Sequence, residues 1–368
     1  MDPLTQGALG AIAAQAVCGK HLPRSAWLIG AAAGMAADLD VLIRPAGALL
    51  GGLTYHRHFT HALVFIPIGA LLSAIPFLLF PRLRRHWPVV LLAALVAYAT
   101  HGLLDSFTSY GTVLFWPFSE ARVAWDIMPI VDPVYTLLLI AGLCASVALR
   151  RRSLAVVGAT LSLAYMSFAA VQHTRALDVQ GQLVEKREHA YVRGRALPTP
   201  FNLAMWRSIY EADGLLYADV VRVPYFRAAE VRLGAATPIV TLETLEAEQP
   251  LGPELRAVFE RFAWFADGYT AWDQRAHRTI GDMRYGVSPE VFASLWGLEL
   301  PEPGEDGQAR FVRLHMGWRT GLRRMWVALW GHDPLFHPVT AVIAKTDVGP
   351  SRPAQLLEPR RTAIDRSR

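Results

Sequence analysis

The first 172 residues consist of long apolar runs separated by short polar turns. Four runs are long enough, or nearly so, to cross a bilayer, which takes about 20 residues. These runs are His61–Phe80, Trp87–Leu104, Pro133–Leu149 and Ser153–Gln172. Two earlier runs, Leu4–Gly19 and Ala26–Ile43, are less apolar and rich in Ala and Gly, which suits close helix packing. The pattern predicts an α-helical membrane bundle of about six helices, the first two of which could instead be re-entrant or interfacial.

After Gln172 the composition changes. Only seven of the chain's 31 acidic residues precede His173. This indicates that the part before His173 is embedded in lipid and that the part after it is water-soluble. We therefore expect three parts. They are a helical membrane bundle over 1–172, a smaller soluble α+β domain over 173–345, and a disordered basic tail over 346–368.

Within the soluble domain, two apolar segments flank Asp213-Gly214, a pair that favours a tight turn, so a β-hairpin is predicted there. The segments are Trp206–Glu211 and Leu215–Val223. Two further stretches, Pro253–Phe265 and Ala309–Leu329, have the pattern of helices.

Basic residues alternate between the turns of the bundle and predict its orientation. Three turns, after the first, third and fifth runs, carry eight of them: Lys20, Arg24, Arg82, Arg84, Arg85, Arg150, Arg151 and Arg152. The opposite turns hold only Arg44, Arg57 and Arg122 up to residue 132. By the positive-inside rule the first set faces the cytoplasm, so the opposite turns and the soluble domain face outward.

The net charge of +5 and a pI near 9.3 could indicate nucleic-acid binding. Membrane topology explains the basic turns better, so we expect no binding of nucleic acid. Two cysteines, both within apolar runs, exclude a disulfide framework and a Cys-type zinc site. The segment Met1–Gln6 lacks a basic region and a cleavage site, so we expect it to be retained.

Ionisable side chains gather at the outward ends of the predicted helices, where a buried charge usually marks function. They are Asp38, Asp40, His56, His58, His61, His101, Asp105, Asp126 and Asp132. His58 and His61 are three residues apart, and His101 and Asp105 four apart, so each pair can share one helix face. Imidazole nitrogens and carboxylate oxygens suit zinc, and also manganese or iron. His21 and His86 fall on the cytoplasmic side and receive no role.

Each residue also has a simpler explanation. A single histidine at a membrane interface usually bonds a helix end, aspartates cap helices, and Arg57 could extend its charge to water. Their gathering on one face favours a metal site. The His-Glu-x-x-His, Gly-x-Ser-x-Gly and Pro-Ser-Gly-His motifs are absent, which argues against zincin proteases, serine hydrolases and lipid-phosphate phosphatases.

Several of these segments together resemble the YdjM family of inner-membrane proteins, described as metal-dependent hydrolases. The segments are Met1-Asp2-Pro3-Leu4-Thr5, Asp38-Leu39-Asp40, His56-Arg57-x-x-Thr60-His61, His101-x-x-Leu104-Asp105, Thr108-Ser109-Tyr110-Gly111-Thr112 and Val131-Asp132-Pro133. The family is in turn similar to zinc-dependent phospholipases C and single-strand-specific zinc nucleases. The resemblance implies a bacterial-type inner membrane, and the basic turns predict that the site lies on its outer face.

The resemblance also implies a ligand set. It makes Asp40, His56, His61, His101 and Asp105 the metal ligands, with Asp38 as a further candidate. Family members often carry Thr-His where this chain has Thr5-Gln6, so one possible metal ligand is lost here. His58 stands where a glycine is common, and we treat it as an accessory residue of the site.

These features predict a metal-dependent hydrolase that cleaves a phosphoester, in a lipid or envelope component, at the outer face of the bilayer. Asp132 or Asp126 would act as general base or orient a ligand, and Arg57 would meet the substrate anion. The alternative is a non-catalytic envelope scaffold whose polar cluster stabilises the bundle. An ion pathway is a third reading, but the middles of the last four runs are almost purely apolar, which argues against it.

Overall fold

The computed structural model describes residues 1–43, 49–248, 250–286, 288–302, 307–314 and 334–345, and the backbone of 352–353. It divides into two compact units. Unit 1 comprises Met1–Thr174 and Leu197–Leu203, and unit 2 comprises Arg175–Ala196 and the chain from Ala204 onward. The helix α8 (Arg152–Lys186) begins in unit 1 and ends in unit 2.

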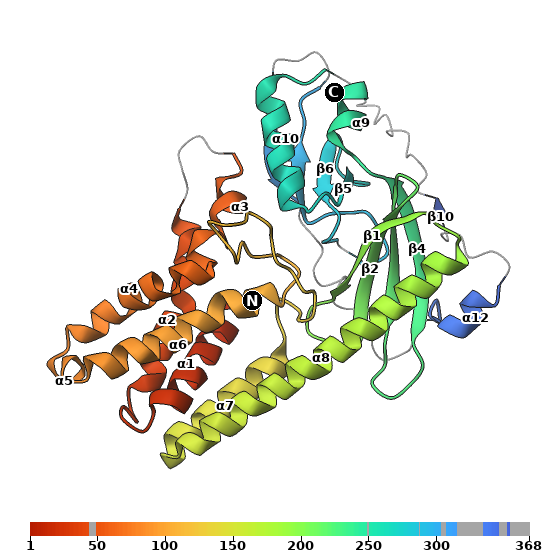
Figure 1. The fold of residues 1–368 in the computed structure, drawn as a ribbon. Coiled ribbons are helices and arrows are strands. Elements are labelled where there is room, and N and C mark those ends of the chain that lie inside the picture. The colour runs from red at the N-terminus through yellow and green to blue at the C-terminus, as the bar shows by residue number, and fades with distance from the viewer. Residues whose placement is uncertain are drawn as a thin grey trace, which may run out of the picture. The chain divides into compact units, whose positions relative to one another are not determined.

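Unit 1 is helical throughout its described elements (Figure 1). Before α8 it holds α1 (Pro3–Cys18), α2 (Ala26–Ala36), the 3₁₀ helix η1 (Ala37–Leu42), α3 (Gly51–Tyr55), the 3₁₀ helices η2 (Phe59–His61) and η3 (Leu63–Phe65), α4 (Ile66–Leu78), α5 (Pro81–Arg84), α6 (Trp87–Ser106) and α7 (Pro133–Leu149). A helix therefore forms in each predicted apolar run.

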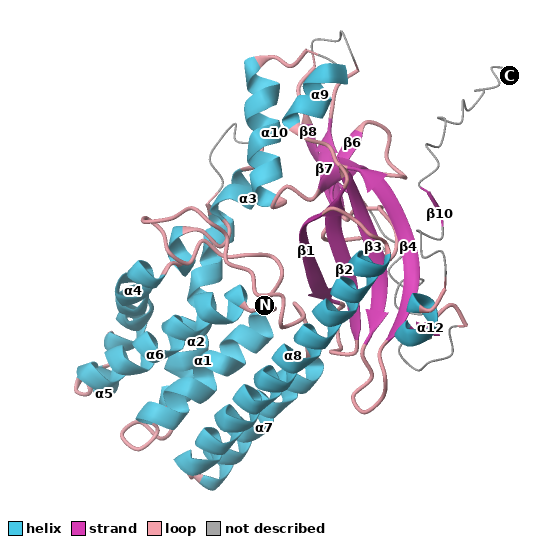
Figure 2. Cartoon of the chain, turned by 45° about the vertical axis from the view of Figure 1, so that its right-hand side comes forward, coloured by secondary structure: helices cyan, strands magenta, loops and turns pink. Residues whose placement is uncertain are grey.

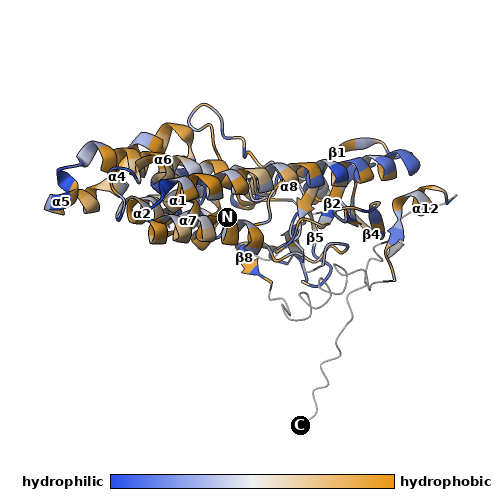
Figure 3. Cartoon of the chain, turned by 90° about the horizontal axis from the view of Figure 1, so that it is seen from below, coloured by the Kyte–Doolittle hydropathy of each residue, from blue (hydrophilic) through white to orange (hydrophobic). Residues whose placement is uncertain are grey.

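The lengths of these helices do not support six membrane spans. Among the described residues, only α6 and α8 are long and apolar enough to cross, or three spans if Gly51–His61 and Leu63–Leu78, bent by 60°, count as one. The 16 residues of α1 and the 11 of α2 reach only about 24 and 17 Å, less than a hydrocarbon core of about 30 Å. Apolar residues nevertheless colour most of the bundle in Figure 3.

Small residues let the first two helices approach closely, as their Ala and Gly content predicts. A Cβ built on Gly10 of α1 would lie 2.4 Å from the carbonyl oxygen of Gly30 and 2.8 Å from Cα of Gly34, both on α2. Contact at that distance is possible only between glycines. This glycine contact holds the start of α1 beside the end of α2. Asp38 lies just after that end, on η1.

Unit 2 contains antiparallel sheets, as expected for the second half of the chain (Figure 2). The larger sheet has the order β1 (Tyr191–Pro198), β2 (Met205–Ala212), β3 (Leu215–Arg222) and β4 (Glu230–Pro238), with β9 (His337–Pro338) antiparallel and β10 (Arg352–Pro353) parallel to β4. The smaller sheet has the order β5 (Thr270–Trp272), β6 (Thr279–Asp282), β7 (Trp296–Glu299) and β8 (Arg310–Arg313). The helices α9 (Leu242–Glu248), α10 (Pro253–Phe265) and α12 (Val339–Ile343) complete its described elements.

The predicted hairpin and one predicted helix are confirmed. Strands β2 and β3 pair in register around Asp213 and Gly214, whose φ angles of 54° and 73° are those of a type I′ turn. The helix α10 has the predicted bounds and buries Phe259, Phe262 and Phe265 along one face.

Two other boundaries differ from the sequence prediction, and one cannot be compared with the structure. The last apolar helix does not end at Gln172 but continues as α8, because Ala176, Val179 and Leu183 form a further apolar face in the core of unit 2. Residues 310–313 of the predicted helix Ala309–Leu329 form β8, and residues 315–333 lie outside the described part of the chain. The predicted tail, 346–368, also lies outside it except for the backbone of β10.

Candidate metal centre

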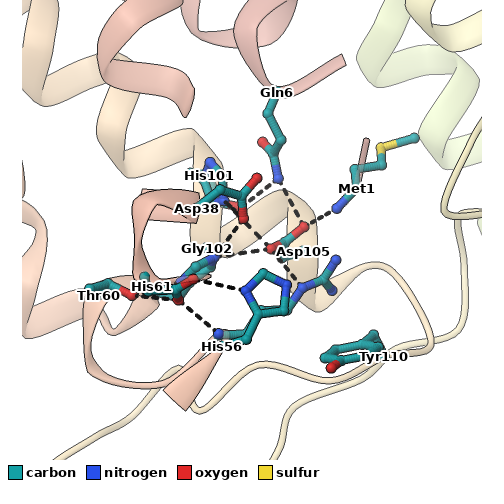
Figure 4. A network of polar contacts seen from close by, with 12 residues as sticks. Met1, Gln6, Asp38, His56, Thr60, His61, His101, Gly102, Asp105 and Tyr110 are labelled. Carbon is teal, nitrogen blue, oxygen red and sulfur yellow. Dashed lines mark hydrogen bonds and ion pairs between the residues drawn. The ribbon is translucent and has the colours of Figure 1, made fainter. Parts of the chain in front are cut away.

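Four ionisable side chains from three elements of unit 1 meet at one point (Figure 4). His101 and Asp105 come from successive turns of α6, His61 from η2 and Asp38 from η1. Each offers one ligand atom, and these atoms all lie within 4.8 Å of one another. The close approach depends on Gly102, where a Cβ would lie 2.3 Å from the carbonyl oxygen of His61.

The spacing between these atoms is nearly uniform. Nε2 of His61 lies 3.3 Å from Oδ2 of Asp105 and 3.5 Å from Oδ1 of Asp38. Nε2 of His101 lies 3.6 Å and 3.3 Å from the same two oxygens. Ligands placed about 2.0–2.2 Å from a tetrahedral ion are separated from one another by about 3.3–3.6 Å. The four distances therefore match four of the six edges of a tetrahedral ligand set.

Hydrogen bonds on the far side of each imidazole leave Nε2 directed at this point. Nδ1 of His101 lies 2.5 Å from the carbonyl oxygen of Gly34, which can only accept, so Nδ1 is the protonated nitrogen. Nδ1 of His61 lies 3.0 Å from Oγ1 of Thr60 and 3.3 Å from Oδ2 of Asp40. Such outer contacts fix a ligating imidazole in the tautomer that a metal needs.

Three buried atoms at the centre of the cluster make no hydrogen bond to the described residues. They are Nε2 of His61, Nε2 of His101 and Oδ2 of Asp105. Buried polar atoms are normally satisfied, and an exception requires an explanation such as a bound ion. The donor set, two imidazoles and two carboxylates, is one that zinc accepts. The residues present therefore fit a divalent metal ion.

Asp40 supports the cluster from outside its centre. One oxygen lies 2.8 Å from Nδ1 of His56, and the other accepts hydrogen bonds from the backbone N–H of Arg57 and the hydroxyl of Thr60, both at 2.9 Å. Burial raises the pKa of Asp40, but the contacts with His56 and His61 outweigh it and hold that pKa well below its usual range. Asp38, Asp40 and His56 form a second group that could hold an ion.

Groups other than the two imidazoles also balance the charge of Asp105, on both of its oxygens. Nε of Arg57 lies 3.1 Å from Oδ2 of Asp105, and the amide of Gln6 donates to Oδ1 at 2.9 Å. The amino group of Met1 forms an ion pair with the same Oδ1. Arg57, predicted to meet a substrate anion, thus has its guanidinium on Asp105; it also donates to Thr108 at 2.9 Å.

Two predicted catalytic residues are not among the side chains that could hold the ion. Asp132 caps α7, accepting from the N–H of Tyr135 at 3.0 Å and from the hydroxyl of Tyr165 at 2.8 Å, and burial raises its pKa. Asp126 is buried with a φ of 58°, and in the described part of the chain neither aspartate belongs to a group that could hold an ion. Capping, the simpler explanation of an aspartate before a helix, accounts for Asp132.

His58 and His61 do not share a helix face as predicted. His58 lies before the 3₁₀ turn of residues 59–61 with non-helical backbone angles (φ −97°, ψ −126°), and its ring lies against Phe59 and Trp116, with centroid distances of 6.3 and 6.0 Å. His101 and Asp105, by contrast, share one face of α6 as predicted.

Sequence reasoning missed two groups around the cluster. The carbonyl of Gly34 carries no side-chain signal, so no sequence pattern could reveal its contact with His101. Gln6 was noticed only as a missing ligand, whereas its amide donates to Asp105. A signal did exist for it, because polar Thr5 and Gln6 interrupt an otherwise apolar helix start.

Apolar helices with a buried His/Asp cluster define a membrane protein with a group of side chains that could hold a metal ion. Residues 1–176 match the YdjM inner membrane protein family, and this range contains every residue of the cluster. No curated protein and no solved structure matches the chain, so the predicted similarity to zinc-dependent phospholipases C and nucleases gains no support.

Proposed function

We propose that Asp38, His61, His101 and Asp105 bind one divalent ion, and that the protein is a membrane-bound metal-dependent hydrolase. The observation that supports this most directly is the set of four nitrogen–oxygen distances between 3.3 and 3.6 Å, which fit four of the six edges of one tetrahedron. Nε2 of His61 and Nε2 of His101 make no hydrogen bond to the described residues, and a bound ion would satisfy both.

Zinc is the ion that we expect, since two imidazoles and two carboxylates in tetrahedral arrangement suit it best, and manganese or iron would also accept these donors. A single ion is favoured because, in the second group, both oxygens of Asp40 already have partners. One contacts Nδ1 of His56, and the other accepts from Arg57 and Thr60. The bound ion would supply Lewis-acid activation of water and of a phosphoryl oxygen.

The surrounding residues would position the ligands. Asp40 and Thr60 hold the ring of His61 in its ligating tautomer, and Gly34 does the same for His101. Arg57 keeps Asp105 charged and in place. Asp38 offers the route for water and substrate, because its side chain is 22% exposed whereas those of the other three are at most 1% exposed.

The substrate that we propose is a phosphoester in a lipid or an envelope component. The cluster lies at the carboxyl-terminal end of α6, opposite the basic turn of Arg82, Arg84 and Arg85 that precedes this helix. If that basic turn faces the cytoplasm, the cluster lies near the outer surface of a bacterial-type inner membrane. A site at that depth could meet the headgroup of a lipid without extracting it from the bilayer.

One observation favours a second function, that of a non-catalytic envelope scaffold. Four protein ligands complete a tetrahedron, and structural metal sites are closed in this way, whereas catalytic sites keep a position open. In this alternative the ion would hold α6, η1 and η2 together, and unit 2 would bind partners.

A phosphodiesterase assay separates the two functions. The full-length protein would be reconstituted in vesicles, loaded with zinc, and given bis(4-nitrophenyl) phosphate or a phospholipid, with and without chelator. We expect the wild-type protein to hydrolyse the substrate and the chelator to abolish this activity. Asp38→Asn should lower the rate at least about 100-fold. The matched control Asp132→Asn should keep the wild-type rate. A protein that holds zinc but hydrolyses neither substrate in any of these forms would be a scaffold.

A further inference from the structure

The loop that joins β3 to β4 carries the most exposed aromatic side chain among the described residues. In the segment Pro224-Tyr225-Phe226-Arg227, Phe226 is 98% exposed and Tyr225 is 48% exposed (the loop can be followed in Figure 2). Neither ring belongs to the described core clusters of unit 2. A fully exposed Phe contributes nothing to folding and favours transfer from water to an apolar phase.

The loop is bonded to α8 just after the apolar part of that helix. Arg175 donates one hydrogen bond to the carbonyl oxygen of Pro224 and another to that of Arg227, each of 2.9 Å. These two carbonyls bracket the aromatic pair, so a single side chain fixes both ends of the segment.

The position of Arg175 places the loop relative to the membrane. The exposed apolar residues of α8 that could face lipid end at Val171, which is 55% exposed. Arg175 follows four residues later on the same unbroken helix, a rise of about 6 Å. A segment bonded at that height lies within the headgroup layer, if α8 crosses the bilayer.

We propose that Tyr225, Phe226 and Arg227 form an interfacial anchor, inserted into the headgroup layer of the membrane that α8 crosses. Tyrosine is enriched at this depth, where its ring contacts acyl chains and its hydroxyl stays hydrated, and a Phe beside it gains by burial at the boundary of the acyl chains. Arg227 adds a cation for lipid phosphates. The anchor would fix unit 2 against the outer membrane surface, independently of whether the cluster in unit 1 binds metal.

Site-directed spin labelling tests the anchor. The label would be placed at Phe226→Cys in full-length protein carrying Cys144→Ala; Cys18 is buried and stays unlabelled. The protein would be reconstituted in vesicles of phosphatidylethanolamine and phosphatidylglycerol. Two reference labels would be Cys144 itself, exposed on the apolar helix α7, and Tyr191→Cys, half-exposed on β1.

We expect the label at position 226 to collide with oxygen more, and with a water-soluble nickel chelate less, than the label at position 191. Its accessibility to the chelate should lie between those of positions 191 and 144. Equal chelate accessibility at 226 and 191 would overturn the proposal. So would a label immobile and inaccessible to both reagents, which would indicate a protein partner.

Discussion

Both units of the chain bury charged side chains, but they satisfy them differently. In unit 2, Arg284 contacts both oxygens of Asp282, at 2.9 and 2.7 Å, and donates a further bond to the carbonyl of Phe265. Arg187 likewise contacts both oxygens of Asp219, at 2.7 and 3.1 Å. In unit 1, Nε2 of His61 and Nε2 of His101 converge on Oδ2 of Asp105 without a hydrogen bond, and Nε of Arg57 lies 3.1 Å from the same oxygen.

The difference teaches how to separate a structural pair from a binding site. A buried pair that satisfies its own donors and acceptors needs nothing else, and it can be explained by the fold alone. A cluster that leaves two buried imidazole nitrogens without a hydrogen bond carries a cost that a bound cation would remove. Shifted pKa values occur in both units and do not distinguish them, whereas this convergence of imidazole nitrogens and carboxylate oxygens is seen in unit 1.

The largest expected effect is the loss of the ion on replacing Asp105. In Asp105→Ala, the ligand oxygen is removed and Arg57 is left as a buried charge without its partner. We expect the purified variant to contain no stoichiometric zinc, measured by plasma mass spectrometry after reconstitution with metal. Wild-type zinc content in Asp105→Ala would contradict the assignment of Asp105 as a ligand.

Replacing the paired aspartate of unit 2 should affect stability instead. Asp282→Ala leaves the fully buried Arg284 uncompensated, which we expect to destabilise unit 2 by about 3–5 kcal/mol. Hydrogen exchange of the β5–β8 sheet would report the loss, and zinc content should remain that of the wild type. If metal were lost as well, the cluster of unit 1 would not be the site of binding.

A smaller effect is expected from Asp40, which orients a ligand without providing one in our proposal. Asp40→Asn should weaken zinc affinity about 10–100-fold while leaving the stoichiometry unchanged, as for other partners of ligating histidines. Competition with a chelating dye would give the affinity. An affinity change as large as that of Asp105→Ala would show that Asp40 is itself a ligand, as the family resemblance implied.

The smallest effect should come from Asp132, the cap of α7. Asp132→Asn keeps an acceptor for the N–H of Tyr135, so we expect a destabilisation of about 1 kcal/mol and unchanged zinc binding. Thermal unfolding in detergent, followed by circular dichroism, would measure it. Loss of hydrolysis with intact zinc binding would instead revive Asp132 as a general base.

Much of this arrangement could be predicted from the sequence, because periodic features are local. The apolar runs, the hairpin at Asp213-Gly214 and the helix α10 follow from patterns within a few residues. The i, i+4 spacing likewise placed His101 and Asp105 on one face of α6.

What could not be predicted depends on contacts between distant segments. Asp38 and Asp40 are two residues apart, and nothing local indicates that Asp38 reaches the centre while Asp40 binds His56 behind it. The end of α2 at Ala36, and the 3₁₀ geometry of η1 that follows, decide this. The role of Arg57 depends in the same way on the position of Asp105, 48 residues further along the chain.

X-ray absorption at the zinc edge of the reconstituted protein tests the central claim most directly. The proposal predicts about four nitrogen or oxygen neighbours at roughly 2.0–2.1 Å, two of them with the outer-shell scattering of imidazole. In His61→Ala the imidazole contribution should fall to that of one ring. A spectrum of hydrated zinc without imidazole scattering, or one that His61→Ala leaves unchanged, would contradict it.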